Sequence, residues 1–159
     1  PIWTADWFWP EAEKAGIPVM VFAPFGLDHI MTIADRHPRL RLIVDHMGLY
    51  REKDAEAARV IVETARLARC PNIHVKITTV PFYTTDLYPF CNLHDPIHRL
   101  IDAFGPRRCF WGTDLTRLRG RTPYRQLVTM FTDEMRFLSD EDLAWVMGRG
   151  VAECLGWPL

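Results

Sequence analysis

The sequence lacks the patterns that mark several large classes of protein. No apolar run approaches the roughly 20 residues that a membrane-crossing helix needs, so we expect no membrane partner. The 159 residues carry a formal net charge of -1 and no Lys/Arg stripe, which argues against nucleic acid as a partner. Neither a GxGxxG pattern nor a P-loop follows the first apolar run, so a nucleotide-binding sheet is not supported.

Cysteine is scarce, and its spacing suggests neither zinc nor redox chemistry. No CxxC pair occurs, and the four cysteines are far apart in the chain: Cys70, Cys91, Cys109 and Cys154. We interpret them as small buried apolar residues, and unpaired cysteines lead us to expect a reducing, cytoplasmic location. Residue 1 is Pro rather than Met, so we expect the chain to be part of a longer one.

Short apolar runs alternate with segments of helical pattern along the whole chain. The runs expected to form strands are 17–23, 40–45, 72–78 and 108–112. The segments expected to form helices are 6–15, 27–36, 55–67, 96–104 and 139–147. Because the runs show no polar alternation, they suit parallel strands buried on both faces. Their recurrence about every thirty residues matches one unit of an eight-stranded α/β barrel. The pattern predicts a single α/β domain over residues 1–159, half of a TIM barrel, with an open four-stranded sheet as the alternative.

Two polar residues stand where expected strands end, which is where barrel enzymes place their catalytic groups. His46 follows the second strand, and Asp114 follows the fourth with Gly112 before it, which we expect to let the backbone turn. A neutral imidazole ligates a metal or polarises a carbonyl, and a carboxylate takes a proton from water. A structural histidine and a helix-capping aspartate are the alternatives. Together the two residues favour a hydrolytic site.

Other polar residues near the same strand ends are candidates for binding a small-molecule substrate. Lys76 lies on an otherwise apolar strand, where an unpartnered charge is costly. Arg117 and Arg119 follow the fourth strand, and the guanidinium fork suits carboxylates. Tyr83 lies in the long connection 78–94, which has no helical period. For these residues a surface arginine, a lysine reaching out between helices and a structural flap are the alternatives.

Five segments resemble the amidohydrolase-related family of barrel hydrolases, which contains lactonases and decarboxylases. They occur in the family's order: 18–21 as strand five, 43–48 (IVDHMG) as strand six, 72–76 (NIHVK) as strand seven, 110–114 (FWGTD) as strand eight and 146–157 as the terminal helix. The resemblance implies the C-terminal half of a TIM barrel, with about four βα units. It also implies a water-dependent hydrolase that cleaves a lactone, ester or C–N bond of a small, carboxylated substrate, or a decarboxylase of the same family. In such enzymes the residue matching Asp114 shuttles protons and sometimes binds metal, and the residue matching His46 binds metal or polarises the carbonyl.

Two departures from the family pattern concern the metal. The chain contains no HxH, which in the family belongs to strand one, and Phe22 or Ala23 stands where metal-dependent members have a strand-five histidine. Phe22 is then expected to line the substrate pocket. The resemblance therefore implies one divalent metal such as zinc in the complete protein, or none, and we expect no tight zinc binding by the chain as given. A non-catalytic half-barrel or binding module is the alternative. Two open sheet edges also predict a homo-oligomer.

Overall fold

The computed structural model describes residues 5–118 and 120–158, and its centre is a four-stranded parallel sheet. The strands lie side by side in chain order: β1 (Val19–Val21), β2 (Leu42–Val44), β3 (Ile73–Thr78) and β4 (Cys109–Gly112). Helices connect and follow them: α1 (Phe8–Ala15), α2 (Leu27–Arg36), α3 (Asp54–Thr64), α4 (His94–Phe104), α5 (Leu115–Leu118), α6 (Tyr124–Thr129), α7 (Asp140–Ala144) and α8 (Gly150–Leu155). The predicted α/β alternation is confirmed.

Local sequence signals explain where several helices begin and end. α1 ends at Gly16, whose left-handed backbone (φ 64°) is the one that glycine adopts at lowest cost. Ser139 caps α7 by accepting a hydrogen bond from the backbone N–H of Asp142. α4 begins at His94, two residues before the expected start at 96, so Asp95 lies inside its first turn.

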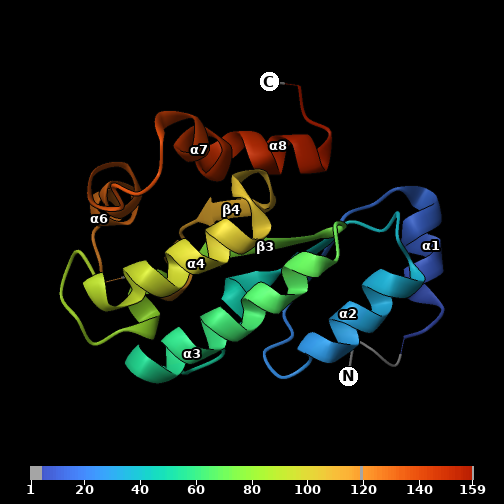
Figure 1. Cartoon of the computed structure of the whole chain (residues 1–159), viewed down its shortest axis with the longest axis horizontal. Helices are drawn as coiled ribbons and strands as arrows, with labels where there is room; N and C mark the ends of the chain where they lie inside the picture. The colour runs from blue at the N-terminus through green and yellow to red at the C-terminus, as the bar shows by residue number, and fades with distance from the viewer. Residues whose placement is uncertain (1–4, 119, 159) are drawn as a thin grey trace.

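The outer face of the sheet packs against helices and holds the main core. Alternate strand residues point to it and are fully or almost fully buried: Val19, Val21, Leu42, Val44, Ile73, Val75, Ile77 and Cys109. Figure 1 shows α2, α3 and α4 in succession along one side of the sheet, with α7 and α8 beyond β4. This layer fixes the strand ends in space, and the strand ends carry the candidate site.

The inner face is only partly covered by the described residues, so the expectation of strands buried along both faces is wrong for three of the four. The β1 residue that points inward, Met20, is 52% exposed, and in β3 the inward-pointing His74 and Lys76 are half-buried. Only β2 is buried along its whole length. Burial alternates along β1 and β3 because helices of the described chain cover one face of the sheet and leave much of the other face open.

Helix α8 covers part of the inner face of the sheet. Ile43 and Phe110, which point inward from β2 and β4, form a small cluster with Cys154 of α8. A Cβ on Gly150 would lie 2.7 Å from the carbonyl oxygen of Arg107, so glycine allows this helix to approach the segment that enters β4. The Arg41 guanidinium donates to the carbonyl of Cys154 at 2.6 Å and also to that of Gly16, which ties both ends of the described chain to the start of β2.

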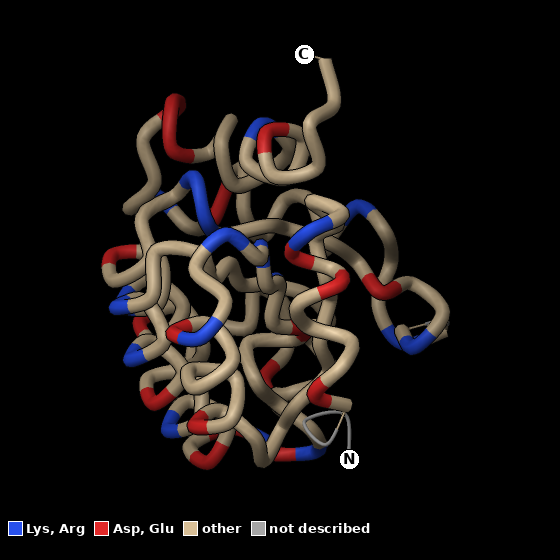
Figure 2. The backbone as a smooth tube through the Cα atoms, turned by 90° about the vertical axis from the view of Figure 1, so that its right-hand side faces the viewer, with Lys and Arg blue, Asp and Glu red and all other residues tan. Residues whose placement is uncertain are grey.

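The remaining expectations concern cysteines, charge and membrane spans. Cys70, Cys109 and Cys154 are buried as predicted, but the prediction is wrong for Cys91, which is exposed. Figure 2 shows Lys and Arg interspersed with Asp and Glu along the chain. None of the helices in the described ranges is long and apolar enough to cross a membrane.

Candidate active site

The carboxyl ends of β2, β3 and β4 bring His46 and Asp114 to one place. Nε2 of His46 lies 3.9 Å from Oδ2 of Asp114, and both side chains are mostly buried, with 14% and 26% of their surface exposed. The separation is too wide for a direct hydrogen bond, which spans about 2.7–3.2 Å. The two atoms therefore face each other across a gap that leaves room for a third group.

Two threonines that the sequence argument did not single out contact His46, and one of them also bonds Asp114. Oγ1 of Thr79 donates to Oδ2 of Asp114 at 3.0 Å and lies 3.1 Å from Nδ1 of His46. Oγ1 of Thr78 lies 2.6 Å from the same nitrogen. The rule that selected His46, a polar residue where a strand ends, applies equally to these two residues at the end of β3.

The contact with Thr79 favours a proton on Nδ1 of the neutral imidazole. The Thr79 hydroxyl has one proton, and an ionised Asp114 can only accept it. Toward His46 the same oxygen presents a lone pair, which attracts an Nδ1–H and repels an unprotonated Nδ1. Burial lowers the pKa of His46 below its usual range, against a smaller opposing effect of Asp45 and Asp114. The imidazole is therefore neutral near pH 7, with the lone pair of Nε2 directed into the gap.

Left-handed backbone conformations shape every turn of this site. His46, Met47, Thr79 and Asp114 have φ values of 53°, 56°, 62° and 48°, although none is glycine. Such conformations cost about 1–3 kcal/mol each and persist only where the surrounding structure enforces them. They aim the side chains of the three strand ends at one another, which extended backbone at these positions would not do.

Two glycines allow the close packing that holds the site. A Cβ on Gly48 would lie 2.6 Å from Oγ1 of Thr64, which donates to the carbonyl of Met47, so the His46 turn rests against α3. A Cβ on Gly112 would lie 2.8 Å from Cγ2 of Thr78. We expected Gly112 to let the backbone turn, but its φ is not positive and the left-handed residue is Asp114. The correct reason for Gly112 is space for Thr78.

The other residues proposed from the sequence have different surroundings. Phe22 is 45% exposed and meets the His46 ring edge-on at 5.7 Å between centroids, so it forms a wall of the site. Lys76 lies on the inner face, with Nζ 2.7 Å from Oδ1 of Asp45, so this lysine is neutralised by a neighbouring carboxylate. Arg117 donates to the carbonyl of Tyr50 at 3.1 Å.

Tyr83 and Arg119 are the remaining candidates that the sequence suggested for substrate binding. Tyr83 is fully buried, and within the described residues its hydroxyl has no hydrogen-bond partner. Burial raises the pKa of Tyr83 to about 12. Its expected contact with substrate is not tested by the structure and remains a prediction. Arg119 lies outside the described residues.

The long connection after β3 is anchored by one carboxylate. Oδ1 of Asp54, at the start of α3, accepts hydrogen bonds from the backbone N–H of Thr85 at 2.7 Å, from Nδ2 of Asn92 at 2.8 Å and from Oγ1 of Thr84 at 3.2 Å. Its Oδ2 accepts from the Thr85 hydroxyl at 2.8 Å. These bonds lower the pKa of Asp54, with the Thr85 backbone N–H the largest cause. They hold the connection against α3, beside the site.

The donor set fits a divalent metal only in part. The 3.9 Å between Nε2 of His46 and Oδ2 of Asp114 is less than the sum of two metal–ligand bonds of about 2.1 Å each, so one cation can contact both atoms. Protein zinc sites use about three or four protein ligands. The described residues contain no group of three His, Cys, Asp or Glu that would hold a metal. The chain thus offers two suitable donors and not a complete set.

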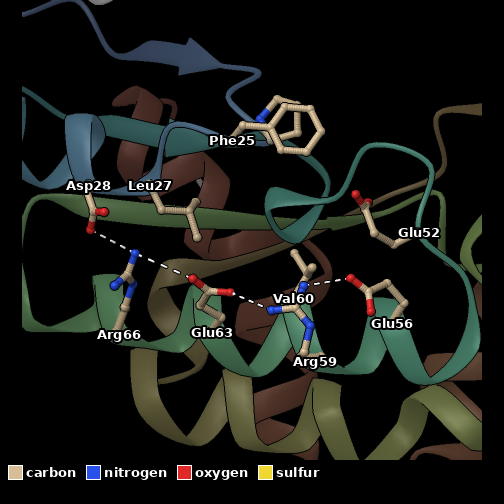
Figure 3. Close-up of a pocket in the computed structure, with 10 residues that line it drawn as sticks. Phe25, Leu27, Asp28, Glu52, Glu56, Arg59, Val60, Glu63 and Arg66 are labelled. Carbon is tan, nitrogen blue, oxygen red and sulfur yellow. Dashed lines mark hydrogen bonds and ion pairs between the residues drawn. The ribbon is translucent and has the colours of Figure 1, made fainter.

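A hollow of about 310 Å³ between α2 and α3 does not compete as a site. Figure 3 shows charged residues lining it in a chain of ion pairs: Asp28, Arg66, Glu63, Arg59 and Glu56. Its lining includes neither His46 nor Asp114. Because these charges satisfy one another, the hollow is an exposed ion-pair network whose members contribute little each.

Comparison with known proteins shows the family to which the chain belongs. A family model described as amidohydrolase matches residues 3–150, so the chain belongs to the amidohydrolase family. The resemblance that five sequence segments suggested is confirmed at this level.

Three relatives illustrate the similarity. An L-fucono-1,5-lactonase of Burkholderia ambifaria is 27% identical over 99 residues, which cover 61% of this chain and 34% of the relative. An amidohydrolase from Burkholderia multivorans, crystallised with bound zinc, superposes with a TM-score of 0.82 at 18% identity over 99% of this chain and 60% of that one. A probable 2-pyrone-4,6-dicarboxylic acid hydrolase from Acinetobacter baumannii, crystallised with citric acid, gives 0.75 at 13% identity over 96% and 57%. The chain therefore spans about a third of the first relative and somewhat over half of the two structures.

Proposed function

We propose that the chain is the C-terminal half, strands five to eight, of an amidohydrolase barrel that opens a small lactone carrying a carboxylate. The observation that carries this proposal is the network in which Thr79 joins Asp114 to the neutral imidazole of His46. It holds a proton acceptor and a nitrogen lone pair on opposite sides of one gap. The likeness to a lactonase and to a probable pyrone-dicarboxylic acid hydrolase supports the substrate class.

Asp114 acts in this proposal as the general base and then as the general acid. A water oxygen forms a bond to the lactone carbonyl carbon while Asp114 accepts a proton from that water. The bond between the carbonyl carbon and the ring oxygen then breaks, and Asp114 returns the proton to the ring oxygen. The product is the open hydroxy acid, so atoms and charge balance. Thr79 keeps Asp114 oriented by donating to Oδ2, and Phe22 bounds the substrate beside His46.

His46 acts through the lone pair of Nε2. In this tautomer Nε2 has no proton to give, so the residue suits a metal ligand better than a group that polarises a carbonyl by donating to it. His46 and Asp114 would hold one divalent cation such as zinc, together with donors from outside the described residues. A divalent cation in such a place supplies Lewis-acid polarisation and lowers the pKa of water.

The role of Asp114 is tested by hydrolysis of a panel of carboxylated lactones. We expect Asp114→Asn to reduce kcat/KM by about 10²–10⁴-fold, the usual contribution of a general base. Asp102→Asn, a change of the same kind on the exposed side of α4, is the matched control and should leave the rate unchanged. Equal rates for Asp114→Asn and the wild-type chain would remove Asp114 as the base.

One observation favours a second candidate, a half-barrel that is not catalytic by itself. The inner face is half open in the described chain, and the site contains two metal donors where about three or four are usual. A chain that folds but cleaves none of the lactones, with or without added zinc, would support this candidate and contradict activity of the chain alone.

A further inference from the structure

Three cationic side chains surround one aromatic ring beside the proposed site. The Phe82 ring lies 4.1 Å from Cζ of Arg117, 5.0 Å from Nζ of Lys53 and 5.4 Å from Cζ of Arg121, measured to the ring centroid. These residues come from three places in the chain: α5, the residue before α3 and the turn after α5. We call Phe82 with these three cations the Phe82 cluster.

None of the three cations forms an ion pair with a carboxylate in the described part of the chain. Lys53 donates to the carbonyl of Phe82 at 2.6 Å, and Arg117 donates to that of Tyr50 at 3.1 Å. The side chain of Arg121 has no described hydrogen bond, only its contact with the ring. The contrast with Figure 3 is direct, since there the arginines between α2 and α3 are paired with carboxylates.

Like charges around one ring repel one another, and each guanidinium retains unused donors. The attraction of the Phe82 ring for each cation offsets part of this repulsion. An anion bound by Lys53 and Arg121 would offset more of it, because the anion attracts both cations.

A cavity of about 600 Å³ is lined by two members of this cluster, Lys53 and Arg121, and not by Phe82 or Arg117. Pro81, Leu87 and Phe90 contribute apolar surface to its lining. Leu87 is 88% exposed, so its side chain is open to a ligand in the cavity. The size is typical of small-ligand pockets.

The cavity also contains one carboxylate and three neutral polar side chains besides Tyr88. Asp86 lines it, and its Oδ2 accepts a hydrogen bond from the backbone N–H of Asn92 at 3.2 Å. Its charge offsets one cation at most and leaves an excess of positive charge. Thr84, Thr122 and Gln126 supply the neutral groups.

We propose that this cavity binds a small organic carboxylate, with its anionic group at Lys53 and Arg121 and its apolar body against Leu87 and Phe90. The site lies next to the proposed catalytic pair but uses none of its residues. The proposal is therefore independent of lactone hydrolysis, and measurements of carboxylate binding are enough to test it.

The test is a titration of the ¹⁵N-labelled chain with benzoate, followed by amide chemical shifts at constant ionic strength. Benzamide, which has the same ring without the charge, is the control ligand. We expect benzoate to shift the amides of Leu87 and Thr122 saturably and benzamide to shift them little. Higher salt should weaken benzoate binding, since both the ligand and the cations are exposed.

Arg121→Gln is the informative variant, because it removes a cation whose side chain makes no described hydrogen bond. We expect it to raise the Kd for benzoate about tenfold, the loss of one charge-assisted hydrogen bond. Arg136→Gln changes the net charge equally, lies outside the lining of the cavity and should leave the Kd unchanged.

Three results would each overturn the proposal. The first is equal binding of benzamide and benzoate. The second is equal weakening by Arg121→Gln and Arg136→Gln. The third is a shift pattern centred on His46 and Asp114, which would place the carboxylate in the catalytic gap instead. Spectra of both variants that match the wild-type spectrum away from the cavity establish that each is folded.

Discussion

Replacing Thr79 by Val should destabilise the chain by about 1–2 kcal/mol, the usual cost of removing a hydroxyl that bonds charged and polar partners. Thr79 is 1% exposed, and its oxygen is 3.0 Å from Oδ2 of Asp114 and 3.1 Å from Nδ1 of His46. Valine has nearly the same shape and is also β-branched, so the left-handed backbone and the packing stay as they are. The change isolates the two hydrogen bonds.

The structure sets the size of this effect. His46 keeps a second partner in Thr78, 2.6 Å from Nδ1, so the imidazole is not left without a hydrogen bond. Asp114 is 26% exposed, so water can replace part of what Thr79 provided. A buried polar group that loses its partner usually costs about 1–3 kcal/mol of stability. Because of these two features, we expect Thr79→Val to fall in the lower part of that range.

The assay is urea unfolding followed by tryptophan fluorescence, combined with a double-mutant cycle. With a urea slope of about 1–3 kcal/mol per M, the midpoint should fall by roughly 0.3–2 M. The cycle of Thr79→Val with Asp114→Ala should show a coupling free energy of about 1 kcal/mol, as expected for residues in contact. Strain from alanine at a left-handed position occurs in both the single and the double variant, so it cancels.

A cycle of Thr79→Val with Asp102→Ala on α4 is the control and should show additive effects. If the Thr79–Asp114 coupling is as small as in this control, the hydroxyl does not hold Asp114. The positioning role given to Thr79 would then be wrong, whatever the activity of the chain.

Two further substitutions test the packing around the site. Gly112→Ala should destabilise the chain by about 1–3 kcal/mol in urea unfolding, because the added Cβ would lie 2.8 Å from Cγ2 of Thr78. Gly148→Ala is the control and should not destabilise the chain, since the space around its Cβ is open. Equal stability of the two variants would contradict the reason given for Gly112. Asp54→Asn should destabilise the chain near neutral pH and lose this effect in acid. Hydrogen bonds lower the folded-state pKa of Asp54, so its stabilisation is present above the unfolded value of about 3.9 and disappears as pH falls through the folded value. Asparagine tolerates the left-handed φ of 51° at this position, so the variant reports on the charge, and a stability difference that does not change between about pH 7 and pH 3 would refute the argument.

The sequence predicts the strands because their apolar residues are buried by the outer helices. Runs 17–23, 40–45, 72–78 and 108–112 each contain an observed strand, shortened by one to four residues. Turn residues at their ends, such as Gly16 and Gly105, carry part of this information. The burial of both faces could not be predicted correctly, because the covering of the inner face depends on α8 and on what lies opposite the sheet.

The titratable members of the candidate site were predicted from the sequence, and its two threonines were missed. His46 and Asp114 were found because a polar side chain at the end of an apolar strand contrasts with its neighbours. Thr78 and Thr79 escaped notice because threonine is common in strands, and only the left-handed backbone of Thr79 turns its hydroxyl toward the pair.

Some expectations depend on side-chain partners that no pattern in one sequence reveals. Lys76 was expected to bind substrate, but its ion pair with Asp45 emerges only when β2 and β3 lie side by side. The members of the Phe82 cluster also come from separate segments of the chain, so their proximity could not be predicted from the sequence. The expected homo-oligomer, drawn from open sheet edges, stays a prediction.

The seating of α8 on the inner face has a consequence for biosynthesis. Ile43 and Phe110 emerge from the ribosome well before Cys154, the residue that completes their cluster. During synthesis the first strands can pair and cover their outer face, while the lower inner face stays open until the last helix is made. Arg41 likewise waits for the carbonyl of Cys154. A nascent chain that stalls before residue 150 would therefore display an apolar sheet surface around Ile43 and Phe110.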